Sequence, residues 1–171
     1  DCTTAYATRK GFNGSVRTVR MCNSTLWADV AHPIFIGIHG NSEVGDSIVG
    51  LVYENIDIIC HSEPQVDYQG CMAINCGDNK VGYNAKYCTA PGKGVENVTF
   101  RHIRYNGDQP YLSVINGYNE ERKVKNITFE GLKINGRLIH DKMPGKPGWY
   151  QTADFVPIYV GNHVDGMTFK K

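Results

Sequence analysis

The sequence lacks an excess of charge of either sign. Its 171 residues include 18 lysines and arginines against 17 aspartates and glutamates, which gives a formal net charge of +1. Like charges do not form runs either, so the chain offers no electrostatic attraction for nucleic acid or for an anionic membrane surface. We therefore expect neither nucleic acid nor a membrane among its partners.

Long apolar runs and helical periodicity are also missing. No apolar stretch approaches the roughly 18 residues that a membrane-spanning helix needs, and apolar residues do not recur with the spacing of an amphipathic helix. Nineteen glycines and a hydrophobic content of 41% instead favour an all-β chain with many turns. A chain of this length fits one domain, residues 1–171.

Six cysteines are present, but the sequence has no C-x-x-C pair and no Cys/His spacing typical of a zinc site. We therefore expect no metal site, and we expect no cofactor. An even number of cysteines permits disulfides in a non-cytosolic protein. Cys22, Cys71 and Cys76, however, lie within predicted strands, which is equally typical of free thiols in a core. The sequence leaves both interpretations open.

The chain repeats itself. The segment Val95–Gly107 (V-E-N-V-T-F-R-H-I-R-Y-N-G) returns 29 residues later as Val124–Gly136 (V-K-N-I-T-F-E-G-L-K-I-N-G). Weaker copies begin at Val16, Val49 and Val164. Within each copy, apolar residues fall on every second position with a one-residue phase slip. This pattern predicts two short strands joined by a bend.

A shorter apolar pattern that ends in glycine follows each copy. Its four occurrences are Pro33–Gly37, Cys71–Gly77, Leu112–Gly117 and Phe155–Gly161. Each unit is therefore predicted to run strand, bend, strand and then a further strand. Such units, with glycines at their corners and no helix between them, can bury alternate side chains only by coiling, so that each rung pairs with the next.

These repeats predict a right-handed parallel β-helix, a single solenoid with long loops on one edge. Asn97 and Asn126 are expected to lie above one another at a corner, where their amides hydrogen-bond along the stack. Two interior columns are expected, one of Val16, Val49, Val95, Val124 and Val164, and one of Val19, Val52, Val98, Ile127 and Met167. The competing architecture is a β-sandwich, whose strands need not resemble one another.

The two ends of such a coil leave backbone groups without partners. The chain opens on Asp1 rather than on Met and begins and ends in mid-rung. We therefore expect it to be the C-terminal rungs of a longer parent protein, or to associate through its open ends.

Polar and titratable residues concentrate in loops beside the shorter strands. Equivalent positions on successive rungs lie about 4.8 Å apart, so loop residues that are distant in sequence can converge in one groove. A pair of carboxylates there can act as general acid and base on a glycosidic bond. The candidate catalytic acids are Asp1, Asp29 and Asp67. The candidate substrate-binding residues are His32, His39, Tyr68, Asp78, Trp149 and Tyr150.

Each candidate also has a purely structural interpretation. Asp29 suits the cap of a turn, and His32, which precedes a proline, can be fixed by packing. Trp149 and Tyr150 form either a stacking platform for sugar rings or a lid over exposed core. Asp67 lies in an insertion that packing alone does not require, which favours a functional role.

Three segments carry a family resemblance that extends over nearly the whole chain. They are Cys22–Gly40 (C-N-S-T-L-W-A-D-V-A-H-P-I-F-I-G-I-H-G), Gln69–Asp78 (Q-G-C-M-A-I-N-C-G-D) and Met143–Tyr150 (M-P-G-K-P-G-W-Y). They resemble the C-terminal half of glycoside hydrolase family 28-like (polygalacturonase-like) proteins, which have the pectin-lyase β-helix fold. The resemblance implies a secreted or periplasmic β-helix that acts on a plant or microbial polysaccharide.

The resemblance also bears on the catalytic residues. Asp1-Cys2 looks like the last two residues of the family's G-D-D-C segment, which implies that Asp1 matches its second aspartate. The first aspartate and the upstream N-T-D aspartate are absent, and Ala7–Gly11 stands where the family's G-H-G is expected. The R-I-K tripeptide is absent as well.

Two functions from different classes follow. The first is a glycoside hydrolase, or a fragment of one, that cleaves a polysaccharide by carboxylate acid/base catalysis. The second is a non-catalytic β-helix that binds glycan or serves as an extracellular structural module, which the missing paired aspartates favour. A polysaccharide lyase, which would normally need calcium and a basic residue, is a third and weaker alternative.

Overall fold

The computed structural model describes residues 2–5, 8–9, 12–29, 32–37, 47–61, 73–75, 93–107, 113–145 and 155–171. Within these ranges every regular element is a β-strand and no helix occurs. The prediction of an all-β chain is therefore confirmed.

Five strands form a short sheet that is parallel throughout, in the order β1-β6-β9-β11-β15. The strands are β1 (Thr3–Ala5), β6 (Ile34–Gly37), β9 (Ala73–Asn75), β11 (Ser113–Asn116) and β15 (Ile158–Val160). Their register aligns Ile36, Ile74, Ile115 and Val160. The glycine-ended pattern of the sequence therefore does mark equivalent strands.

The longer strands form a second sheet, which is also mainly parallel. Its members are β4 (Val16–Arg17), β5 (Arg20–Ala28), β7 (Ile48–Val49), β8 (Val52–His61), β10 (Val95–Tyr105), β12 (Val124–Glu130), β13 (Lys133–Ile134), β14 (Arg137–Leu138), β16 (Val164–Asp165) and β17 (Thr168–Lys170). Among the described strands, only β13 with β14 and β2 (Thr8–Arg9) with β3 (Phe12–Asn13) pair antiparallel.

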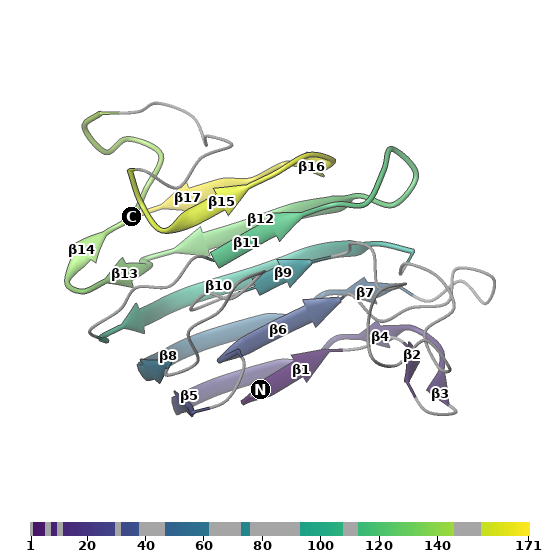
Figure 1. Ribbon diagram of the computed structural model, residues 1–171, viewed down its shortest axis with the longest axis horizontal. Coiled ribbons are helices and arrows are strands. Elements are labelled where there is room, and N and C mark those ends of the chain that lie inside the picture. Colours follow the sequence, from purple (N-terminus) through teal and green to yellow (C-terminus); the bar gives the residue numbers. More distant parts are fainter. Residues whose placement is uncertain are drawn as a thin grey trace.

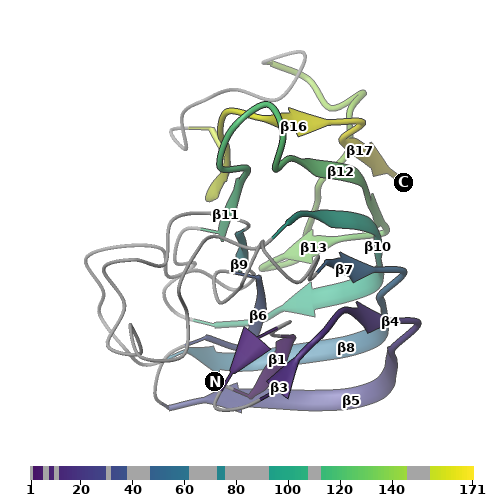
Figure 2. The same cartoon turned by 90° about the vertical axis from the view of Figure 1, so that its right-hand side faces the viewer.

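The chain alternates between the two sheets as it advances. It passes from β5 in the long sheet to β6 in the short one, returns to β7 and β8, and then continues to β9, β10, β11 and β12. Figures 1 and 2 show the successive strands stacked one above another, with β5 at one end of the stack and β16 and β17 at the other. This parallel pairing argues against the sandwich, whose two sheets are antiparallel.

The observed structure confirms the main repeat and corrects two other copies. In the first copy Val19, expected in an interior column, is 48% exposed. Val95 pairs with Val124 and Val98 with Ile127, as predicted. In the second copy, however, Ile48 rather than Val49 pairs with Val95, and Val52 pairs with Thr99, one position beyond the expected partner. The buried residues are Ile48 and Leu51, which are 2% and 1% exposed. Because side chains alternate between the faces of a strand, the one-residue offset places Val49 and Val52 outside the core.

Aromatic rings form a continuous column through the core. Tyr53, Phe100, Phe129 and Phe169 occupy matched positions on successive rungs. Their ring centroids are 5.3, 4.6 and 4.8 Å apart, and the ring planes are within 13° of parallel. The column arises because the aromatic residue of each copy falls at the same register position, where parallel pairing stacks one ring on the next.

The bends predicted within the repeats are positions with left-handed backbone. Asn97 and Asn126 have φ of 56° and 55°, and Asn126 Nδ2 donates to Asn97 Oδ1 at 3.1 Å, which confirms the predicted asparagine pair. The register continues this corner to Gly50 and Gly166, whose φ values are 74° and 73°. Asparagine and glycine adopt such angles at the lowest cost, so they recur where the chain turns.

The two cysteines whose side chains are described fit neither sequence interpretation. Cys2 and Cys22 are free thiols, and both are exposed. Cys22 is therefore neither bonded nor part of the core, because it follows Met21 and its side chain alternates to the outer face of β5.

Candidate functional site

The described candidate residues lie where the start of the chain meets the end of β5. The backbone N–H of Cys2 donates to the His32 carbonyl at 2.9 Å, and that of Thr3 donates to the Pro33 carbonyl at 3.2 Å. Asp29 directly follows β5 and is exposed. Parallel pairing of β1 with β6 thus brings residue 2 to the segment around residue 32.

The Cys2 thiol and the Asp29 carboxylate interact electrostatically. Burial raises the pKa of the Cys2 thiol most, and the carboxylate of Asp29 raises it further, because a nearby negative charge disfavours the thiolate. A backbone hydrogen bond from Trp27 acts in the opposite direction. The end of β5 and the first described residue of the chain therefore share one electrostatic environment.

His32 occupies a different environment from Asp29. It is 8% exposed, and its ring lies 4.6 Å from that of Phe35, centroid to centroid, at an interplanar angle of 34°. Packing against Phe35 holds the imidazole, in line with the structural interpretation of a histidine before a proline. Its predicted contact with substrate stays a prediction.

The remaining predicted site residues lie outside the described part of the chain. They are Asp1, His39, Asp67, Tyr68, Asp78, Trp149 and Tyr150. The structure therefore places Asp29 just after β5 and His32 just before β6, and the other predicted positions stay predictions.

The outer face of the long sheet carries a different set of carboxylates, which are paired with arginines. Arg104 binds Asp57 through two bonds, Nε to Oδ1 at 2.6 Å and Nη2 to Oδ2 at 2.7 Å. The Arg104 hydrogen bonds hold the pKa of Asp57 below its usual value. A carboxylate held ionised in this way is a poor proton donor, so Asp57 is not a candidate general acid.

A second row of charges alternates in sign along the stack. Glu54 lies between Arg20, at 2.5 Å, and Arg101, at 3.6 Å, and Arg101 also contacts Glu130 at 3.3 Å. The Arg20 hydrogen bond lowers the pKa of Glu54. Solvent-exposed pairs of this kind contribute little stability, and their regular spacing indicates a role in matching neighbouring rungs.

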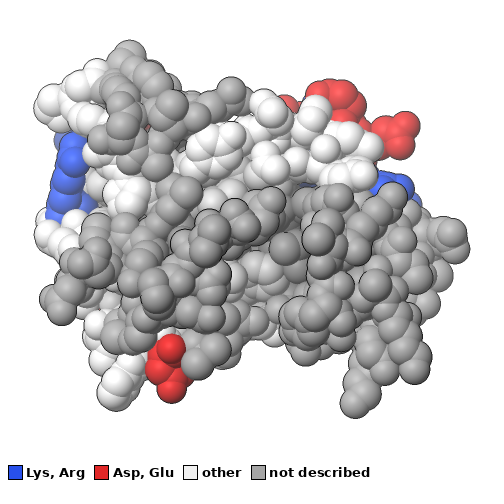
Figure 3. Space-filling model, in the orientation of Figure 1, with Lys and Arg blue, Asp and Glu red and all other residues white. Residues whose placement is uncertain are grey.

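Figure 3 shows where the described charges of one face lie. Acidic side chains lie in two places, near β16 and at the β5 end of the stack, and basic side chains lie at the two sides of the face. The described atoms of this face thus carry no broad patch of one sign, in agreement with the net charge of +1.

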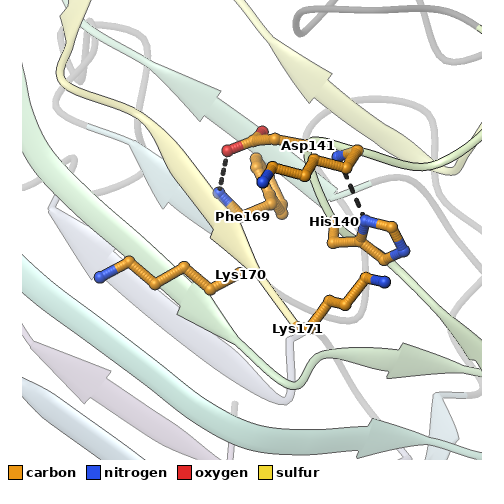
Figure 4. A pocket seen from close by; sticks show the side chains of 6 residues that line it. His140, Asp141, Phe169, Lys170 and Lys171 are labelled. Carbon is orange, nitrogen blue, oxygen red and sulfur yellow. Dashed lines mark hydrogen bonds between the residues drawn. The ribbon is translucent and has the colours of Figure 1, made fainter.

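A cavity of about 440 Å³ lies beside β17, and sequence reasoning did not predict it. It is lined by His140, Asp141, Lys142, Phe169, Lys170 and Lys171. Asp141 bonds both backbone groups of Phe169. Its N–H donates to the Phe169 carbonyl at 2.9 Å, and its Oδ2 accepts from the Phe169 N–H at 3.0 Å, the bond that Figure 4 draws. The only sequence signal was the position of His140 and Asp141 at the start of a long insertion.

A smaller cavity of about 220 Å³ lies at the corner between β8, β10 and β13. Asn55, His102, Arg104, Gly131 and Lys133 line it. Arg104 Nη2 donates to Asn55 Oδ1 at 2.9 Å, so the bidentate arginine also holds the corner asparagine.

The described residues include no group of three or more histidine, cysteine, aspartate or glutamate side chains placed to hold a metal ion. Within the same part of the chain, no helix is long and apolar enough to cross a membrane.

Comparison with known proteins gives no match: neither a family model, nor a curated protein, nor a solved structure matches this chain. The functional argument therefore depends on the residues and their geometry.

Proposed function

We propose that the chain is a right-handed parallel β-helix that hydrolyses glycosidic bonds of a polysaccharide outside the cytoplasm. Support for the β-helix comes from parallel pairing at equivalent repeat positions and from the alternation of the chain between two sheets. The right hand follows the strong preference of parallel crossovers for that hand.

Asp29 is the candidate acid or base of this reaction. Its side chain is exposed, and among the described residues it forms no salt bridge, in contrast to Glu54 and Asp57. An exposed carboxylate with no described salt bridge can contact a bound sugar directly. This contrast is the observation that carries the proposal, and the family resemblance of the Cys22–Gly40 segment supports it.

The second carboxylate is proposed to be Asp1 or Asp67. Asp1 is the neighbour of Cys2 in the sequence, and the Asp29 carboxylate raises the pKa of the Cys2 thiol. A separation of about 5–5.5 Å between the two carboxyl groups implies retention of the anomeric configuration, whereas about 6.5–9.5 Å implies inversion. The stereochemistry of the product, observed by NMR during hydrolysis, therefore reports this distance.

The test is the rate of reducing-end release from a panel of neutral and acidic polysaccharides. Asp29→Asn is expected to lower the rate about 10²- to 10⁴-fold, because that is the usual contribution of a general acid or base. Glu121→Gln is the matched control, since Glu121 is an exposed carboxylate on a distant turn. If Asp29→Asn hydrolyses the polymer as fast as the control does, the assignment of Asp29 is wrong.

The alternative is a non-catalytic β-helix that binds glycan. The observation in its favour is that Glu54 and Asp57, on the outer face of the long sheet, are neutralised by arginines. Such a protein would retain a polymer on an affinity matrix without shortening it. Retention with no new reducing ends, in the wild-type chain, would favour this alternative over hydrolysis.

A further inference from the structure

A second bend of the rungs places residues with left-handed backbone above one another on the long sheet. The members of this column are Asn23, Asn55, His102 and Gly131, with φ of 53°, 53°, 52° and 67°. The register of the paired strands makes their positions equivalent. Asparagine and glycine adopt such angles at the lowest cost. His102 is the one described member of the column that is neither, so the bend alone does not account for its imidazole.

The amide ladder of this column stops before His102. Asn55 Nδ2 donates to Asn23 Oδ1 at 2.8 Å, but Asn55 Oδ1 accepts from Arg104 Nη2 at 2.9 Å. On the other side of His102, a Cβ at Gly131 would lie 2.7 Å from the imidazole Nδ1, so glycine leaves room for the ring. Within the described part of the chain, the imidazole has no hydrogen-bond partner. It is therefore available to a ligand.

A second column, two residues further along each strand, supplies charge. Asp57, Arg104 and Lys133 occupy matched positions on β8, β10 and β13 (Figure 1). Arg104 and Asp57 neutralise one another through their bidentate pair. Lys133 is exposed and forms no salt bridge with a described residue. The column thus carries one positive charge that no described carboxylate balances.

Arg104 also keeps a donor for a ligand. A guanidinium has five N–H groups. In Arg104, Nε and Nη2 donate to Asp57, Nη2 also donates to Asn55, and Nη1 donates to the His102 carbonyl at 3.1 Å. One N–H on Nη1 is left without an acceptor among the described residues.

The cavity of about 220 Å³ lies between these two columns, and His102, Arg104 and Lys133 line it together. It has room for a group of several non-hydrogen atoms. Its lining combines an ammonium, a guanidinium N–H and an imidazole, and converging donors with an excess of positive charge are suited to an oxyanion. The strands β8, β10 and β13 are each paired on both sides, so the cavity is built within the stack.

We propose that this cavity binds one oxyanion group, a carboxylate or a sulfate. Lys133 supplies the charge, Arg104 and His102 supply N–H donors, and Gly131 keeps space for the imidazole. The group is either a free ion or a substituent of an acidic polysaccharide. The site goes beyond the proposed function, because binding there requires neither Asp29 nor hydrolysis.

NMR titration of the full chain with sodium sulfate, at constant ionic strength, tests the proposal. Saturable shifts are expected for the His102 imidazole and the Gly131 amide. Lys133→Glu is expected to raise the dissociation constant at least about tenfold, because attraction of the anion becomes repulsion. Lys93→Glu is the matched control, since Lys93 is an exposed lysine before β10, whose far end carries Arg104. Shifts that do not saturate, or equal weakening by the two substitutions, would overturn the proposal.

His102→Asn tests the imidazole without disturbing the bend. Asparagine occupies the same column at Asn55 with φ of 53°, so the variant is expected to keep the fold. Loss of the imidazole donor is expected to raise the dissociation constant for sulfate about three- to tenfold. The amide spectrum of the free variant checks that the fold is retained. Unchanged affinity in a folded variant would refute the role of His102.

Calorimetry with oligosaccharides identifies the source of the anion. The Asp29→Asn chain is used, so that the ligand stays intact if the proposed hydrolysis occurs. A uronic-acid oligosaccharide that binds more tightly than a neutral one of equal length, and loses this advantage in Lys133→Glu, would assign the site to a polysaccharide. Equal binding of the two, with sulfate binding retained, would assign it to a free ion. Because binding is measured without turnover, failure of this proposal is distinguishable from failure of the enzymatic one.

Discussion

The outermost strands of the long sheet, β17 and β5, differ in how their outer backbone groups are bonded. At the C-terminal end, Asp141 bonds the N–H and the carbonyl of Phe169, and the edge of β17 is closed at that point. At β5, no described strand pairs with the outer edge, and Val19 and Trp27 are exposed. The comparison teaches that a repeated strand leaves a further strand edge, and that at β17 this edge is bonded by a residue from outside the repeat, Asp141.

The aromatic column gives the largest expected difference between the ends. Phe169 is 2% exposed and stacks on Phe129, whereas Met21, at the matched position of β5, is only half-buried. Phe169→Ala is expected to lower the free energy of unfolding by about 3–5 kcal/mol. Met21→Ala is expected to cost less than half as much. Equal losses in chemical denaturation would contradict the claim that the C-terminal end is the better covered one.

Tyr53, on the strand β8 that pairs with β5, provides a test by pH. Burial raises the pKa of its hydroxyl to about 12, against a hydrogen bond with the Thr3 side chain that acts to lower it. The neutral phenol is thus favoured in the folded chain. The associated stability is complete below about pH 10, and about 2–3 kcal/mol is lost as pH rises to about 12.

Alkaline unfolding of the wild type and of Tyr53→Phe checks this prediction. The phenylalanine variant retains the ring but does not titrate, so its stability is expected to fall less steeply between about pH 10 and 12. Parallel curves for the two proteins would mean that Tyr53 ionises equally well in the folded and unfolded chain.

Removing the Asp141 carboxylate should leave the outer edge of β17 without its side-chain hydrogen bond. Asp141→Ala leaves the Phe169 N–H, which is partly buried, without its acceptor. The expected loss is about 1–2 kcal/mol, in the range for an unsatisfied buried donor. The exposed edge should also increase self-association. Lys142→Ala, at the next position, is the control, and an equal effect of the two substitutions would remove the special role of the carboxylate.

The corner asparagines give an expected effect of about the same size, and it should be similar along the stack. Asn126→Ala introduces a side chain that adopts φ of 55° only at a cost of about 1–2 kcal/mol, and it also removes the bond to Asn97. Asn126→Gly relieves the backbone cost and is expected to be the more stable of the two. Thermal unfolding that ranks alanine above glycine would show that the left-handed bend is not required.

Much of the fold could be predicted from the sequence because the repeat is strict. Val95 and Val124, and Asn97 and Asn126, pair as the alignment of V-x-N-(V/I)-T-F predicts. The second copy was misplaced by one residue, since Val49 and Val52 satisfy the same pattern as Ile48 and Leu51. In a strand, apolar residues at adjacent positions leave the buried face ambiguous until its pairing partner is known.

The candidate site could be predicted less well than the fold. Asp29 was identified from its residue type and from its place beside a strand, and its lack of a described ion pair appears only in three dimensions. The clamp between Asp141 and Phe169 joins an insertion to the last strand, so no repeat spacing indicates it. Likewise, the exposure of Trp27 appears only in three dimensions.

The most direct test of the difference between the ends is amide hydrogen exchange, measured residue by residue on dilute and on concentrated protein. We predict that the Phe169 amide is protected under both conditions, whereas the amides of β5 that no described strand bonds exchange more rapidly. Strong protection of those β5 amides in the dilute monomer, or rapid exchange at Phe169, would contradict the account.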